Sequence, residues 1–79
     1  MNRQELEEIL IKERIRPDAY DLAGGHDSER YTLREVSRRW DVYYSERGIE
    51  SGRRSFSNEH DACTYLLKLI LEDLTTRDE

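Results

Sequence analysis

The chain has 79 residues, and a chain of this length forms one domain, because it buries only about 60% of the surface that its unfolded form exposes. Charged residues make up 39% of the sequence and hydrophobic residues 35%, which indicates a thin core and a densely ionic surface. Such a domain has little room for a deep active-site cleft. We therefore expect a binding protein without enzymatic activity.

The sequence favours a reducing compartment. Cys63 is the only cysteine, so no intramolecular disulfide can form. Residues 1–8 carry three acids and no apolar run of about 7–15 residues, so they resemble neither a signal peptide nor a membrane anchor. We expect a cytoplasmic protein that does not associate with membranes.

The charge is unevenly distributed along the chain. The formal net charge is −5, but residues 30–54 hold seven arginines and four acids, a local balance of +3, so the rest carries −8. A basic middle between acidic flanks suits a charged protein partner and weakens the case for nucleic-acid binding. Eleven of the 13 basic residues are arginine, a bias that either a protein interface or a GC-rich genome produces.

Residues 3–14 are predicted to form an amphipathic helix, because their apolar residues recur at helical spacing. Asn2 and Glu5 have the spacing of a capping box at its start. Pro17 is expected to end the helix, since a proline pushes the residue before it, Arg16, into an extended conformation.

Alternating apolar and polar residues then predict short strands. These run from Ala19 to a turn at Gly24-Gly25, from Arg30 to Arg34, from Trp40 to Ser45, and from Arg53 to Phe56. Ser37-Arg38-Arg39 is predicted to form a reverse turn, and Gly48 and Gly52 to bracket a loop. The side chains expected to face the core are Tyr20, Leu22, Tyr31, Leu33, Trp40, Val42, Tyr44 and Phe56, with Trp40 at its centre. The other face of the sheet is expected to stay in water.

A second helix is predicted over residues 59–74, with Ser57 or Asn58 as its N-cap. Its apolar side chains cover an arc of roughly 240°, which is too wide for a single contact. Either the first helix and the sheet cover different parts of this arc, or Leu67 and Leu71 form a partner or dimer surface.

The predicted fold class is α+β, with residues 1–79 as a single domain and residues 75–79 as a frayed tail. The expected architecture is a helix, a three- to four-stranded antiparallel meander and a C-terminal helix. Short connections favour antiparallel pairing, and both helices are expected on one face of the sheet.

No catalytic, cofactor-binding or metal-binding residues are predicted. His26 and His60 lack a second ligand at metal spacing. Cys63 lies on the apolar side of its helix, which favours a packed, inert thiol. Gly24-Gly25 lacks the pattern of a phosphate-binding loop and leads into a strand, so it is interpreted as a turn.

The open sheet face carries the one constellation suited to binding. It consists of Arg30, Arg34, Arg53 and Tyr43, since arginine and tyrosine dominate interface energies. The alternative is that Asp21 and Asp41 neutralise these arginines by cross-strand pairing.

The central run resembles a known family. Its motifs are W-D-V-Y-Y-S-E-R-G at residues 40–48, a strand ending at Phe56, and E-H-D-A-C-T-Y at residues 59–65. Over residues 19–70 the chain resembles small bacterial immunity proteins encoded beside polymorphic toxins, including those of contact-dependent growth inhibition systems. The resemblance implies a protein that binds and blocks the effector domain of its cognate toxin, often a nuclease. We expect a monomer in a 1:1 complex.

The residues predicted to contact this partner lie on the third strand and at its exit, together with one arginine of the last strand. They are Asp41, Tyr43, Glu46, Arg47 and Arg53. The acidic first helix, with Glu7, Glu8 and Glu13, is the alternative surface for a basic toxin.

A second resemblance favours a different function. The predicted element order is similar to that of double-stranded-RNA-binding domains, and Gly24-Gly25-His26 lies where that family has a Gly-Pro-x-His loop. Those domains place lysines at the start of the second helix to contact phosphates, whereas this chain has Glu59, His60 and Asp61 there. Nucleic-acid binding is therefore the alternative and not the main prediction.

Overall fold

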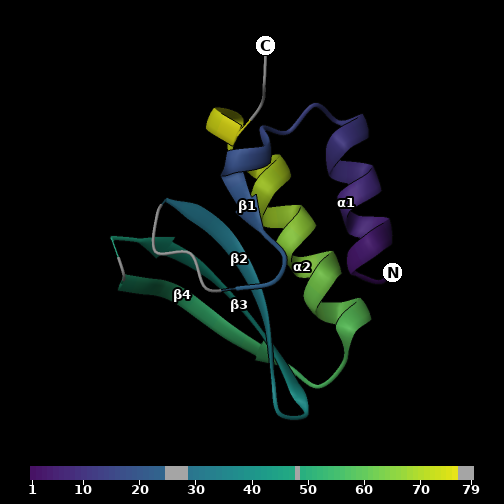
Figure 1. The fold of residues 1–79 in the computed structure, drawn as a ribbon, viewed down its shortest axis with the longest axis vertical. Helices are drawn as coiled ribbons and strands as arrows, with labels where there is room; N and C mark the ends of the chain where they lie inside the picture. The colour runs from purple at the N-terminus through teal and green to yellow at the C-terminus, as the bar shows by residue number, and fades with distance from the viewer. Residues whose placement is uncertain (25–28, 48, 77–79) are drawn as a thin grey trace.

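The computed structural model describes residues 1–24, 29–47 and 49–76 (Figure 1). Its elements follow the predicted order, with a helix, four strands and a second helix. They are α1 (Arg3–Lys12), a 3-10 helix (Pro17–Ala19), β1 (Tyr20–Asp21), β2 (Arg30–Val36), β3 (Arg39–Glu46), β4 (Ile49–Phe56), α2 (Glu59–Glu72) and a second 3-10 helix (Leu74–Thr76). The protein is thus a small α+β domain, as predicted. None of the helices within the described ranges is long and apolar enough to cross a membrane.

The four strands form one sheet in the order β1-β2-β3-β4. β2, β3 and β4 form the predicted antiparallel meander. β1 instead pairs with β2 in parallel, so the prediction of a fully antiparallel sheet is wrong. The physical reason is the connection between these two strands. β1 has only two residues, and residues 22–29 separate it from β2, so the two strands are not joined by the two-residue hairpin that favours antiparallel pairing.

The loop predicted between Gly48 and Gly52 is also wrong, because β4 already begins at Ile49. Gly48 itself lies outside the described residues. Gly52 is part of the strand and has a φ of 65°, a left-handed conformation that favours glycine. The pairing of β4 with β3 shifts between Val42 and Tyr44, opposite this glycine. Gly52 therefore marks a bulge within a strand and not the end of a loop.

α1 ends before the predicted boundary, and its last turn is closed by the backbone. Arg14 adopts a left-handed conformation with a φ of 58°. The amide of Ile15 then donates a 3.0 Å hydrogen bond to the carbonyl of Leu10, in the pattern of a Schellman motif. The helix has therefore ended before Pro17, which starts the following 3-10 helix. Ile15 and Leu10 are both buried, so this cap also directs the chain into the core.

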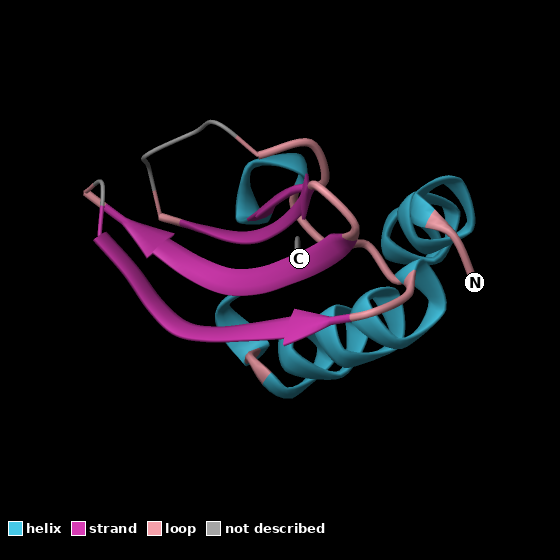
Figure 2. Cartoon of the chain, turned by 90° about the horizontal axis from the view of Figure 1, so that it is seen from below, coloured by secondary structure: helices cyan, strands magenta, loops and turns pink. Residues whose placement is uncertain are grey.

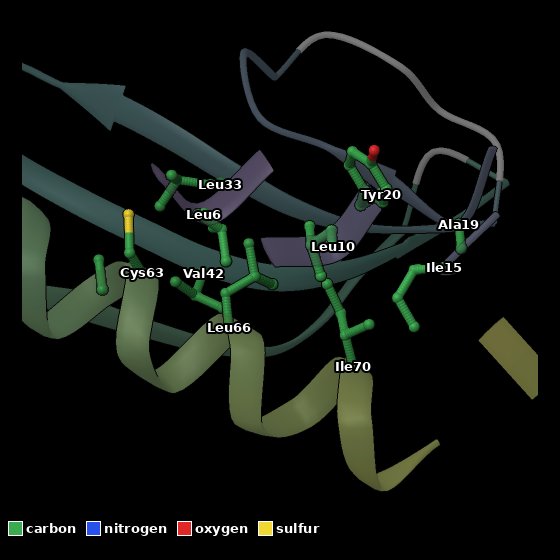
Figure 3. Close-up of a cluster of buried hydrophobic side chains, with 11 residues drawn as sticks. Leu6, Leu10, Ile15, Ala19, Tyr20, Leu33, Val42, Cys63, Leu66 and Ile70 are labelled. Atoms are coloured by element: carbon green, nitrogen blue, oxygen red, sulfur yellow. The ribbon is translucent and has the colours of Figure 1, made fainter. Parts of the chain in front are cut away.

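The core lies between α2 and one face of the sheet, and α1 packs along α2 (Figure 2). Its fully buried hydrophobic side chains come from both helices and the two central strands (Figure 3). They are Leu6, Leu10, Leu33, Val42, Ala62, Cys63, Leu66 and Ile70. Leu67 and Leu71 are partly buried and pack against this core. The wide apolar arc of α2 is therefore covered from more than one direction, by the sheet and by α1.

Trp40 does not occupy the centre of the core, as the sequence analysis expected. It is half-buried at the start of β3, where it packs against the core from the edge. The guanidinium of Arg3 lies 5.5 Å from the centroid of its ring and covers it from outside. Leu33 and Val42, which pair across β2 and β3, occupy the central position instead.

Candidate functional site

The five residues predicted to contact a partner fall into two groups. Asp41, Tyr43 and Arg53 lie on the sheet face opposite α2, within one network of polar contacts. Glu46 and Arg47 lie at the end of β3, in the hairpin that leads into β4. Asp41, Tyr43 and Arg53 are therefore engaged in contacts within the domain, whereas Glu46 and Arg47 are exposed.

Asp41 is the centre of the first group, and its side chain has no exposed surface. One carboxylate oxygen, Oδ2, accepts a 2.8 Å hydrogen bond from Nη2 of Arg53. The other, Oδ1, accepts hydrogen bonds from Oγ of Ser55 at 2.7 Å and from Nε of Arg39 at 3.1 Å. Of the predicted cross-strand pairs, the structure shows that of Asp41 with Arg53, whereas Arg34 pairs with Glu50. The expectation that Asp41 is accessible on an open face is wrong.

The charge state of Asp41 follows from these contacts. Burial favours the neutral acid and on its own raises the pKa of Asp41. The hydrogen bond from Ser55 and the charges of Arg39 and Arg53 outweigh burial, so the pKa lies below its usual value. The buried carboxylate is therefore ionised at neutral pH and forms ion pairs with Arg39 and Arg53.

Tyr43 is also buried, with 3% of its surface exposed, although it points away from the main core. The guanidinium of Arg34 lies 5.3 Å from the centroid of its ring. Arg34 also pairs with Glu50, at 3.5 Å between Nη2 and Oε2. Gly24 packs against the stem of Arg34, where an added Cβ would lie 3.0 Å from Cγ. Tyr43 is therefore buried beneath Arg34, in a layer of polar contacts on this sheet face, and is not accessible to a partner.

Arg53 joins the two halves of this layer. Besides Asp41, it pairs with Glu50, at 3.6 Å between Nη1 and Oε1. One chain of ion pairs thus crosses the sheet face, in the order Arg34, Glu50, Arg53, Asp41 and Arg39. Asp21 closes the edge beside it by accepting hydrogen bonds from the amides of Ala23 and Gly24 at 3.0 and 3.1 Å. This face is polar but largely satisfied by its own contacts.

The hairpin between β3 and β4, unlike the sheet face, carries exposed side chains. Glu46 and Arg47 are exposed, and neither side chain makes a hydrogen bond or an ion pair with any residue that the structure describes. Ile49 lies beside them with 68% of its surface exposed. Together with Ser51, these residues line a shallow, open hollow of about 350 Å³. Arg47 has a φ of 52°, so the turn holds an arginine in a conformation that normally favours glycine.

Sequence reasoning missed Ile49, because its position was assigned to a loop. A signal was present, since an isoleucine between Gly48 and Glu50 is an apolar residue with no predicted neighbour to cover it. The burial of Asp41 and Tyr43 was missed for a different reason. Periodicity places them on the face opposite the helices, but it cannot show that arginines from other strands fold over that face.

The alternative surface on α1 is exposed and acidic. Glu7 and Glu8 are both exposed, and Ile11 beside them has 62% of its surface exposed. Glu13 is the C-cap of the helix and is exposed as well. Of the surfaces predicted to contact a partner, the β3–β4 hairpin and the outer face of α1 are thus both accessible.

The side chains of the cysteine and of the described histidine lie outside both candidate surfaces. Cys63 is fully buried, and burial, followed by the charge of Glu59, raises its pKa to about 11. His60 accepts a hydrogen bond at Nδ1 from the N-terminal ammonium group, at 2.7 Å. His26 lies outside the described residues. In the described part of the chain, no three His, Cys, Asp or Glu side chains gather as metal ligands would.

The start of α2 is the position at which a double-stranded-RNA-binding domain would contact phosphates. Here Asn58 caps the helix by accepting a hydrogen bond from the amide of Asp61 at 2.8 Å. Glu59 accepts a 3.0 Å hydrogen bond from the amide of Arg3. Glu59 thus holds the start of α1 beside α2, and Asp61 accepts a 3.0 Å hydrogen bond at Oδ2 from Nδ2 of the capping Asn58.

No protein-family model, curated protein or solved structure matches the chain.

Proposed function

We propose that the protein is a cytoplasmic immunity protein, which binds the effector domain of one bacterial toxin and neutralises it without catalysing a reaction. The observation that carries the proposal is the exposed hairpin, where Ile49, Glu46 and Arg47 come together without internal partners among the described residues. An exposed aliphatic side chain flanked by free charges of both signs fits the core and rim of a protein interface.

The network on the open face supports this proposal indirectly. Asp41 and Arg53 fasten β3 to β4, and the hairpin projects beyond the point at which they are joined. A docking surface on strands that are held rigidly loses little conformational entropy when it binds a partner. In this account Asp41, Tyr43 and Arg53 position the hairpin, whereas Glu46 and Arg47 contact the toxin.

The charges of the hairpin also bear on partner choice. Glu46 and Arg47 are adjacent and opposite in sign, so they favour a partner with a matching pair of charges over a uniformly charged surface. A nucleic acid presents only negative charge and would be repelled by Glu46 and by the acids at the start of α2. The site therefore favours a protein partner over the nucleic-acid alternative.

Calorimetric titration of the purified chain with the effector domain encoded beside it tests the proposal. We expect a 1:1 complex with a dissociation constant below about 1 μM and loss of the effector's activity in the same molar ratio. Duplex RNA, titrated at physiological salt, is the control and is expected to give no heat. Binding of the RNA in preference to the effector domain would contradict the proposal.

A further inference from the structure

β4 forms one edge of the sheet. Its inner side pairs with β3, and no strand that the structure describes pairs with its outer side. The strand is eight residues long, and all of them except Phe56 are exposed. An edge of this length presents a row of backbone donors and acceptors that can pair with another strand.

The side chains of β4 do not screen this edge. Natural edge strands are commonly blocked by lysine, proline or a bulge; β4 contains neither lysine nor proline, and its bulge at Gly52 lies in the middle of the strand. Its charged residues turn to the two faces of the sheet, where Glu50 and Arg53 join the ion pairs over Asp41. Arg54 lies on the opposite face, 5.6 Å from the ring centroid of Phe56 and 5.0 Å from that of Tyr65. The outer backbone is left open between these two sets of side chains.

The sequence of β4 is complementary to itself when two copies run antiparallel. Aligning all eight residues places Ile49 opposite Phe56, and Glu50 opposite Ser55. The faces agree in this register, because Phe56 pairs with Trp40 on the core side, whereas Ser55 and Glu50 pair with Asp41 and Ser45 on the other. A second copy would therefore continue the sheet without turning either face over.

This register also covers the most exposed large hydrophobic side chain of β4. Ile49 is 68% exposed, and in the paired strand it would lie next to Phe56 of the other copy. Phe56 is itself only partly buried and contacts Tyr65 of α2, with their ring centroids 5.4 Å apart. The two-fold axis repeats this contact at both ends of the strand, so each copy places its Ile49 against an aromatic pair.

We propose that two copies of the chain associate through β4, in antiparallel register, to form one continuous sheet. The sequence analysis expected a monomer, and this inference replaces that expectation for the free protein. It does not depend on the proposed toxin binding. The dimer covers Ile49, which the proposed function assigns to the toxin contact, so the association concerns the free protein and is tested without the toxin. A dimer that bound no toxin would leave this proposal intact.

Sedimentation equilibrium over a range of concentrations tests the association, with two variants of matched chemistry. Ile49→Lys places a charge at the proposed contact, and Ile11→Lys places the same charge on α1, at a residue of similar exposure, 62% against 68%. We expect wild type and Ile11→Lys to dimerise alike and Ile49→Lys to weaken the dimer at least about tenfold. A wild type that stays monomeric up to about 1 mM, or a dimer that Ile49→Lys leaves unchanged, would overturn the proposal.

The register is tested separately by isotope-filtered NMR on a mixture of labelled and unlabelled chains. We expect nuclear Overhauser contacts between the methyl groups of Ile49 in one copy and the ring of Phe56 in the other. Hydrogen exchange should show β4 amides that become more protected as the concentration rises. Contacts from another element, or protection of β4 only when the toxin domain is added, would assign the edge to a different occupant and overturn the proposal.

Discussion

Nη2 of Arg53 lies 2.8 Å from Oδ2 of Asp41, whose side chain has no exposed surface. The two residues belong to neighbouring strands, β4 and β3, and they meet one residue from the bulge at Gly52. A bulge breaks the regular ladder of backbone hydrogen bonds and bends the strand. The ion pair therefore links the two strands beside the point where their backbone ladder is interrupted.

Replacing Asp41 is expected to destabilise the fold. Asp41→Ala removes the acceptor for Arg39, Arg53 and Ser55, and should lower the free energy of unfolding by about 2 kcal/mol, a value below that of a fully buried pair because the arginines are half-exposed. Urea denaturation followed by circular dichroism measures the change. Asp18→Ala is the control, since Asp18 is exposed and pairs with Arg16 at only 3.8 Å. Equal stability of the two variants would contradict the role assigned to Asp41.

The same carboxylate predicts a dependence of stability on pH. The pKa of Asp41 is lower in the folded state than its unfolded value of about 3.9, so the carboxylate contributes stability above that value. This contribution is lost as the pH falls through the folded pKa. The stability difference between wild type and Asp41→Asn should therefore be present at pH 7 and shrink below about pH 4. A difference that stays constant between pH 7 and pH 3 would show that the charge is not involved.

A glycine at position 14 should stabilise the protein. Arg14 has a φ of 58° at the end of α1, a conformation in which its Cβ is strained. Arg14→Gly is therefore expected to raise the free energy of unfolding by about 0.5–1 kcal/mol, measured by thermal and urea denaturation. Arg14→Ala keeps the Cβ and loses the charged group, so it should leave the stability almost unchanged. If alanine stabilises as much as glycine, the effect belongs to the arginine side chain and not to the backbone.

The core should depend more on Leu66 than on Trp40. Leu66 is fully buried between α2 and the sheet, so Leu66→Ala is expected to cost about 3 kcal/mol. Trp40 is half-buried near the start of β3 under Arg3, and Trp40→Ala should cost about 2 kcal/mol despite its larger side chain. Urea denaturation of both variants decides the order. A larger loss for Trp40→Ala would place the tryptophan at the centre of the core after all.

The order of the elements could be predicted from the sequence, because it depends on local patterns. The apolar spacing in α1 and α2 and the alternation in β2 and β3 are strong signals, and Asn2 and Asn58 cap their helices through the predicted type of contact. The parallel pairing of β1 could not be predicted. β1 has only two residues, and periodicity holds no information on the direction in which so short a strand pairs with β2.

The candidate site could be predicted only in part. The sequence placed Glu46 and Arg47 at the exit of β3, and the structure places them in an exposed hairpin. It also placed Asp41 and Tyr43 on the face opposite the helices, but their burial depends on Arg34 and Arg53, which reach them from other strands. Contacts between long side chains of different strands follow from three-dimensional geometry and leave no pattern along the chain.

The role of the hairpin in binding a toxin is tested most directly by comparing two charge reversals for affinity to the effector domain. Glu46→Arg with Arg47→Glu alters the hairpin and leaves the net charge unchanged, whereas Glu7→Arg with Glu8→Arg alters the outer face of α1. Circular dichroism should first show that both variants fold. We expect the hairpin variant to lose affinity at least about 30-fold in calorimetric titration and to lose protection of growing cells, while the α1 variant keeps both. Full affinity of the hairpin variant, together with loss of binding by the α1 variant, would contradict the account and assign the binding surface to α1.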